Sequence, residues 1–134
     1  MKKYFLFIFI FVNVFVLKTN AQIDTAFWFV APEVWQGHDD RPIYLRFASF
    51  DSPATITISQ PANALFPTQS LNLNANDAQS IDLTPWIDMI ENKPVNSVLN
   101  YGLYISSTTP VTAYYEEASI NNPDLFSLKG NNAL

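Results

Sequence analysis

The sequence predicts an all-β protein, an antiparallel β-sandwich with one short helix. Two observations support this fold class. Apolar residues recur at every second position in several short segments, the period of a strand with one buried face. Turn-forming residues, among them nine prolines, separate these segments at regular intervals, as in a sandwich of short strands. Only one segment has the spacing of a helix.

The first 21 residues have the three parts of a secretory signal peptide. Met1–Lys3 is basic, residues 4–17 are apolar except for Asn13, and residues 18–21 end in small side chains. The apolar run is shorter than the roughly 20 residues that a membrane-spanning helix needs. We therefore expect cleavage before Gln22, a secreted or cell-surface location, and no stable membrane span after cleavage. Residues 22–134 would then form the β-sandwich module.

The expected mature chain is acidic and lacks cysteine. Four basic residues remain against twelve acidic ones, a net charge of −8. Nucleic-acid binding needs clustered Lys and Arg, so we expect no nucleic-acid partner. Without cysteine there is no disulfide, thiolate nucleophile or zinc–thiolate site.

Alternating patterns predict the strands in chain order. They cover residues 26–30, 43–49, 54–60, 69–74, 79–83, 101–106 and 111–116. The first is apolar on both faces, which predicts a central strand covered on both sides. In the third, Ile56 and Ile58 alternate with hydroxyl side chains, which is typical of a half-buried strand.

One short helix is expected over residues 85–92. Thr84 can cap it, and Pro85 suits the first helical position because that N–H has no helical acceptor. An apolar stripe toward the sheet is expected from Trp86, Met89 and Ile90.

The last two strands are expected to form a hairpin. To bury the apolar residues of both arms on one face, any two residues that lie opposite each other must have numbers that add up to an even number. This register places Ile105 opposite Val111 and sets Tyr114 opposite Gly102 on the outer face. Residues 126–134 then begin another alternating segment without completing a sheet, so we expect the chain to be a C-terminally truncated fragment of a longer protein.

Several of these segments resemble a known family. Residues 102–115 (GLYISSTTPVTAYY), 122–126 (NPDLF) and 129–134 (KGNNAL) are similar to the N-terminal region of IgGFc-binding-protein-like modules. Residues 25–28 (TAFW) and 54–59 (ATITIS) are similar to its start. The resemblance implies a part of a large bacterial secreted or cell-surface protein, often with a gliding-associated or sorting C-terminal domain. It supplies no catalytic residues.

Residue types used in catalysis are present but poorly arranged. His38 is the only histidine, and its neighbours Asp39 and Asp40 point to different sides, so a solvated loop is favoured over a metal or acid–base site. Glu116 and Glu117 are adjacent on a strand and cannot flank one glycosidic bond together. We therefore expect no enzymatic activity and no cofactor.

Asn122 and Asp124 are weak candidates for calcium ligands. Calcium favours carboxylate and carbonyl oxygens, which a turn can offer. The sequence here lacks the spacing of a dedicated calcium loop, and an Asx-turn at Pro123 is favoured instead.

Aromatic side chains could provide a platform for sugar rings or a protein partner. The candidates are Trp28, Trp35, Tyr44, Tyr104 and Tyr114. Most are expected in the core of so small a domain. Trp35 adjoins a polar loop and Tyr114 shares its strand face with polar residues, so these two are the expected ligand-binding residues.

The sequence favours a non-catalytic adhesion or recognition module whose partner is an extracellular protein or glycan. A carbohydrate-binding module or a fragment of a carbohydrate-active enzyme is the first alternative. A structural spacer domain is the second.

Overall fold

The computed structural model describes residues 22–33, 37, 41–94, 96–121 and 123–131. The expected signal peptide lies outside these residues, as do Trp35, His38 and Asn122. Among the helices described, none is long and apolar enough to cross a membrane.

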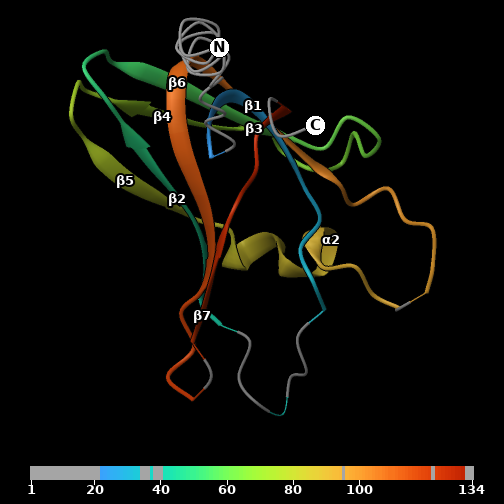
Figure 1. The fold of residues 1–134 in the computed structure, drawn as a ribbon. Helices are drawn as coiled ribbons and strands as arrows, with labels where there is room; N and C mark the ends of the chain where they lie inside the picture. The colour runs from blue at the N-terminus through green and yellow to red at the C-terminus, as the bar shows by residue number, and fades with distance from the viewer. Residues whose placement is uncertain (1–21, 34–36, 38–40, 95, 122, 132–134) are drawn as a thin grey trace, which may run out of the picture.

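The structure is mostly β, as predicted, and every strand pair is antiparallel. The strands are β1 (Ile23–Phe29), β2 (Ile43–Ser49), β3 (Ala54–Ser59), β4 (Gln69–Leu73), β5 (Ala78–Asp82), β6 (Leu103–Glu117) and β7 (Asp124–Ser127). They form one sheet in the order β4-β3-β6-β2-β5, with β1 and β7 also paired to β6. The sheet curves until it is nearly closed into a barrel, and the short helix α2 (Ile87–Ile90) lies at one end (Figure 1).

Strand β6 is the centre of the fold and is continuous, so the predicted hairpin is wrong. Its first half lies between β1 and β3, where Ile105 pairs with Phe27 and Ile58. Its second half lies between β2 and β7. Pro110 is tolerated inside the strand because residues 108–110 belong to no strand pair, so no ladder donor is needed there.

The sheet bends at the level of Pro110. Strands β2 and β3 follow one another along the same edge of β6, interrupted by residues 50–53. Strands β5 and β4 follow the outer edge of β2 and β3, interrupted by residues 74–77. Both rows of neighbouring strands are thus interrupted at the level where residues 108–110 of the continuous β6 are unpaired, and the two halves of the sheet face different directions.

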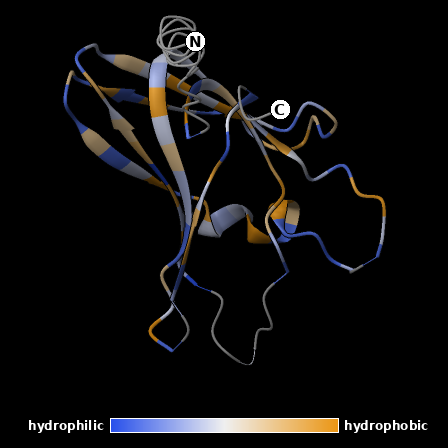
Figure 2. Cartoon of the chain, in the orientation of Figure 1, coloured by the Kyte–Doolittle hydropathy of each residue, from blue (hydrophilic) through white to orange (hydrophobic). Residues whose placement is uncertain are grey.

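The core lies on the inner face of this bent sheet. Alternation in β2 and β3 buries Ile43, Leu45, Phe47, Ile56 and Ile58, as predicted. Figure 2 shows the corresponding alternation of hydrophobic and hydrophilic residues along the strands. The odd-numbered apolar residues of β6 also share the buried face, as expected, although the reason is one long alternating strand rather than a hairpin.

Strand β1 was predicted to be a central strand covered on both sides, and the structure shows otherwise. It pairs with β6 alone, apart from an isolated bridge between Phe27 and Gly130. Phe27 is fully buried, whereas Trp28 is 57% exposed. The second apolar face of this strand is therefore a surface.

The helical segment is confirmed but shorter than predicted. A 3-10 turn, η2 (Thr84–Trp86), leads into α2, which buries Ile87 and Ile90 against the sheet. Thr84 does not cap the helix. Its Oγ1 instead accepts a hydrogen bond of 3.0 Å from the N–H of Ile43, which joins the helical segment to β2.

Candidate functional site

One outer face of the sheet is built without any charged side chain. It is formed by β1, the first half of β6, β3 and β4, where residues opposite one another in the register share a face. We call this surface the neutral face; it consists of Ala26, Trp28, Thr55, Thr57, Ser59, Ser70, Asn72, Tyr104, Ser106 and Thr108. None of these residues is buried, since their strand neighbours occupy the core side.

An aromatic pair lies at one end of the neutral face. Trp28 and Tyr104 are opposite each other on β1 and β6, and their ring centroids are 4.8 Å apart at an interplanar angle of 41°. Within the described part of the chain, neither the indole N–H nor the Tyr104 hydroxyl has a hydrogen-bond partner. Each ring therefore combines an accessible apolar surface with a polar group that can bind a ligand.

Hydroxyl groups occupy the middle of the neutral face. Thr57 lies between Ser106 of β6 and Ser70 of β4 in the register. The Ser70 hydroxyl donates to the carbonyl of Ile56 at 3.2 Å, which holds the hydroxyl oxygen against the sheet with its lone pairs available. The Thr and Ser side chains that alternate with isoleucine in β3 (ATITIS) thus form a row of neutral hydrogen-bonding groups.

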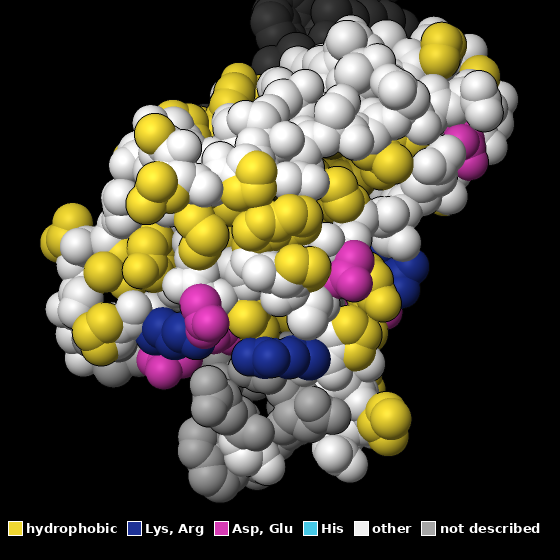
Figure 3. Space-filling view, turned by 180° about the vertical axis from the view of Figure 1, so that it is seen from behind, with side chains coloured by type: hydrophobic (Ala, Val, Ile, Leu, Met, Phe, Trp, Pro, Cys, Tyr) yellow, Lys and Arg dark blue, Asp and Glu magenta, His cyan; other side chains and the backbone are white. Residues whose placement is uncertain are grey.

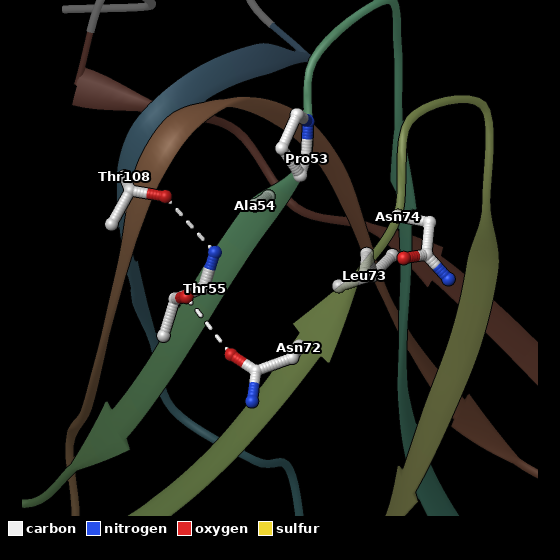
Figure 4. Close-up of a pocket in the computed structure, with 7 residues that line it drawn as sticks. All are labelled: Pro53, Ala54, Thr55, Asn72, Leu73, Asn74 and Thr108. Atoms are coloured by element: carbon white, nitrogen blue, oxygen red, sulfur yellow. Dashed lines mark hydrogen bonds between the residues drawn. The ribbon is translucent and has the colours of Figure 1, made fainter.

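A pocket of about 350 Å³ lies at the other end, at the level where the sheet bends (Figure 4). Its lining consists of Pro53, Ala54, Thr55, Asn72, Leu73, Asn74 and Thr108. The backbone N–H of Thr55 donates to Thr108 Oγ1 at 2.9 Å, and the Thr55 hydroxyl donates to Asn72 Oδ1 at 2.9 Å. These bonds join β3, β4 and β6 across the pocket.

The turn between β4 and β5 fixes one wall of the pocket. Asp77 Oδ2 accepts hydrogen bonds from Gln79 Nε2 at 2.7 Å and from the N–H of Asn74 at 3.2 Å. The bond from Gln79, followed by that from Asn74, lowers the pKa of Asp77 below its ordinary value. Asn76 takes the left-handed backbone conformation, with φ of 55°, that asparagine tolerates well in turns.

Tyr114 lies on the outer face of the other half of the sheet, and its predicted neighbour is wrong. It is opposite Arg46 and Ser127, not Gly102, because the hairpin that would bring it to Gly102 does not form. Arg46 forms an ion pair with Glu116 and stacks over Tyr44, with its guanidinium carbon 5.5 Å from the ring centroid. Tyr114 and the aromatic pair therefore belong to different surfaces.

Some charged side chains of the described residues lie in ion pairs. In the view of Figure 3, Lys and Arg side chains lie next to acidic ones, while hydrophobic side chains extend across the middle of that face. Lys93 Nζ contacts Asp88 at 2.9 Å and the buried Glu91 at 3.0 Å. Each of these ion-paired groups neutralises part of its own charge, which reduces its attraction to a charged ligand.

The two glutamates at the end of β6 point to opposite sides, as expected. Glu116 bonds to Arg46 on the outer face, whereas Glu117 is 3% exposed.

Of the calcium candidates, Asp124 is exposed at the start of β7 and accepts a hydrogen bond of 2.8 Å from the N–H of Leu125. Among the described residues, no group of three or more His, Cys, Asp or Glu side chains could hold a metal ion. The calcium prediction also involves Asn122 and is not tested here.

Sequence reasoning named Trp28 and Tyr104 as aromatic candidates but assigned them to the core. The available signal was the alternation in residues 26–30, which places Trp28 on the face opposite Phe27 and Phe29. Asn72, Asn74 and Thr108 were missed. Asn72 and Asn74 alternate at the end of one predicted strand, but no local pattern connects them to Thr108, which the pairing of distant strands brings beside them.

Comparisons with known proteins identify no family for this chain. No family model matches it, and no curated protein matches it. Among solved structures, the crystal structure of Thermotoga maritima 1070 is similar, with a TM-score of 0.45 and 16% sequence identity over 79% of this chain and 91% of that one. A similarity at this level indicates no shared function. The resemblance to IgGFc-binding-protein-like modules stays a prediction.

Proposed function

We propose that this protein is a non-catalytic recognition module, secreted or displayed at the cell surface, that binds a neutral glycan on the neutral face. The observation that supports this most strongly is the exposed Trp28, packed against Tyr104 at the end of a surface lined by hydroxyl and amide groups. The signal-peptide pattern and the family resemblance support the location.

The chemistry of the neutral face suits a sugar ring. A sugar presents a face of C–H groups with weak positive charge, which packs against the negative face of an aromatic ring. Its hydroxyls need donors and acceptors without full charge, and Ser, Thr and Asn supply these beside the rings. A neutral glycan is favoured over an extracellular protein because protein-binding surfaces are enriched in arginine, and the neutral face has none.

We further propose that the bent sheet acts as a two-layer sandwich. One layer is β1, the first half of β6, β3 and β4, and the other is β7, the second half of β6, β2 and β5. Packing of the two inner faces would hold the neutral face rigid, which reduces the entropy lost on binding.

Binding can be tested with a glycan array followed by calorimetry on the glycans retained. Replacing Trp28 by Ala should weaken binding by about 30-fold or more, since an aromatic hot spot contributes ~2 kcal/mol or more. Leu65→Ala is the matched control, because Leu65 is 84% exposed in a loop outside the neutral face. Equal affinity of the Trp28→Ala variant and the wild-type protein would exclude this face as the site.

The absence of catalysis can be tested with a panel of chromogenic glycosides. We expect no turnover. Turnover that is lost in the Glu116→Gln variant would instead identify a fragment of a carbohydrate-active enzyme. A protein that retains no glycan and turns over no glycoside would be a structural spacer.

A further inference from the structure

We propose that the pocket between Pro53 and Thr108 is a second sugar subsite, so that the ligand is a linear neutral oligosaccharide rather than a single sugar. This inference rests on the proposed function, and it specifies the class of ligand. The pocket and the aromatic pair lie on the same side of the same half-sheet, and the row of hydroxyl side chains connects them.

The separation of the two ends fits a short oligosaccharide. Tyr104 and Thr108 are on one strand, four positions apart, which corresponds to ~13 Å at about 3.3 Å per residue. This is close to the length of a trisaccharide. Ser106 and Thr57 lie between the two ends on neighbouring strands and could contact the central sugar.

The pocket offers mainly hydrogen-bond donors. Thr108 Oγ1 already accepts from the N–H of Thr55, so the Thr108 hydroxyl proton is available to a ligand. Asn72 Oδ1 is engaged by Thr55, and in Figure 4 the Asn72 amide nitrogen points away from that bond. The side-chain amide of Asn74 has no hydrogen-bond partner among the described residues. Sugar hydroxyl and ring oxygens can accept from all three side chains.

The remaining lining excludes charged ligands and accepts an apolar ring face. Pro53 is exposed and supplies apolar contact, whereas Ala54 and Leu73 are each 3% exposed and close the pocket on its core side. The pocket lining includes no Lys, Arg, Asp or Glu. A volume of about 350 Å³ is large enough for one sugar ring with water around it. A carboxylate or phosphate would find no cation there, so we expect a neutral sugar.

The test is the dependence of affinity on oligosaccharide length, measured by calorimetry. The probes are cello-, xylo- and manno-oligosaccharides, from the monosaccharide to the hexasaccharide. For the wild-type protein, affinity should rise about tenfold or more from the monosaccharide to the trisaccharide and then level off. In the double variant Thr108→Val/Asn72→Ala, the monosaccharide should bind as in the wild type, and the gain from a longer chain should be lost.

Two further variants keep the result interpretable. Asn74→Ala replaces an exposed side chain without bonded partners, so it should reduce the gain with length even if the double variant is unstable. Ser127→Ala, on the other outer face, should change nothing.

The outcomes separate this inference from the proposed function. If the trisaccharide and monosaccharide bind equally, or if the gain with length survives in the pocket variants, the second subsite is wrong while the glycan-binding function stands. If no neutral oligosaccharide binds, both are wrong.

Discussion

Gly130 lies so close to Asp24 that a Cβ at position 130 would overlap the Asp24 side chain. Gly130 is buried and forms an isolated antiparallel bridge with Phe27, which ties the segment after β7 to β1. The missing side chain therefore allows the two ends of the described chain to meet at one edge of the sheet.

Replacing Gly130 by Ala should destabilise the protein by about 1–3 kcal/mol, the usual cost of overpacking. Urea unfolding measures this effect. Gly102→Ala is the matched control, because no atom lies within 4 Å of its added Cβ and its φ is not positive. Gly102→Ala should be neutral or slightly stabilising. Equal stability of the two variants would show that β1 does not contact Gly130 closely.

Lys93→Met should destabilise the protein by about 2 kcal/mol. The substitution removes a cation 3.0 Å from Glu91, whose side chain is 1% exposed. Breaking a fully buried pair costs ~3–5 kcal/mol, and the effect should be smaller here because the Lys93 side chain is 25% exposed. Lys129→Met, at an exposed position, is the control. If Lys93→Met loses no more stability than Lys129→Met, then Lys93 does not compensate the buried charge of Glu91.

The turn between β4 and β5 should weaken in acid. The pKa of Asp77 is lowered in the folded protein, so its contribution to stability is present above the unfolded value near 3.8 and is lost as the pH falls through the folded value. Asp77→Asn should reduce stability at pH 7 and flatten the pH dependence of the unfolding midpoint below pH 4. Asp51→Asn should do neither, since the Asp51 side chain has no hydrogen bond or ion pair among the described residues. An acid transition unchanged in Asp77→Asn would contradict this role.

Local alternation was sufficient to predict most of the strands. Residues 43–49 were predicted and form β2 with the same bounds, because their period of two is uninterrupted and no Gly or Pro falls inside. Ile56 and Ile58 are buried as expected, for the same reason. Strand identity and the buried face depend on neighbouring residues along the chain, and a single sequence contains that information.

The arrangement of the strands depends on distant contacts, and here the predictions were wrong. The run Ser107–Pro110 has turn-forming composition, yet it continues β6 because the neighbouring strands break at the same level. The neutral face follows from that pairing: Trp28 faces Tyr104 only because β1 lies beside the first half of β6. Trp35 was selected from its polar neighbours and lies outside the described residues.

The continuity of β6 can be tested with engineered cysteine pairs, since the chain contains no cysteine. In the structure Thr112 lies opposite Ala48, so the pair Ala48→Cys/Thr112→Cys should form a disulfide on oxidation, because opposite Cα atoms in an antiparallel pair are ~4.5–5.5 Å apart.

A hairpin would instead place Tyr104 opposite Thr112. On one continuous strand these residues are eight positions apart, or ~26 Å, far beyond the reach of a disulfide. The Tyr104→Cys/Thr112→Cys variant should therefore keep two free thiols, as counted by thiol titration and by mass spectrometry of a non-reduced digest. An intramolecular disulfide in that variant, with none in the Ala48 pair, would restore the hairpin and separate Tyr104 from Trp28.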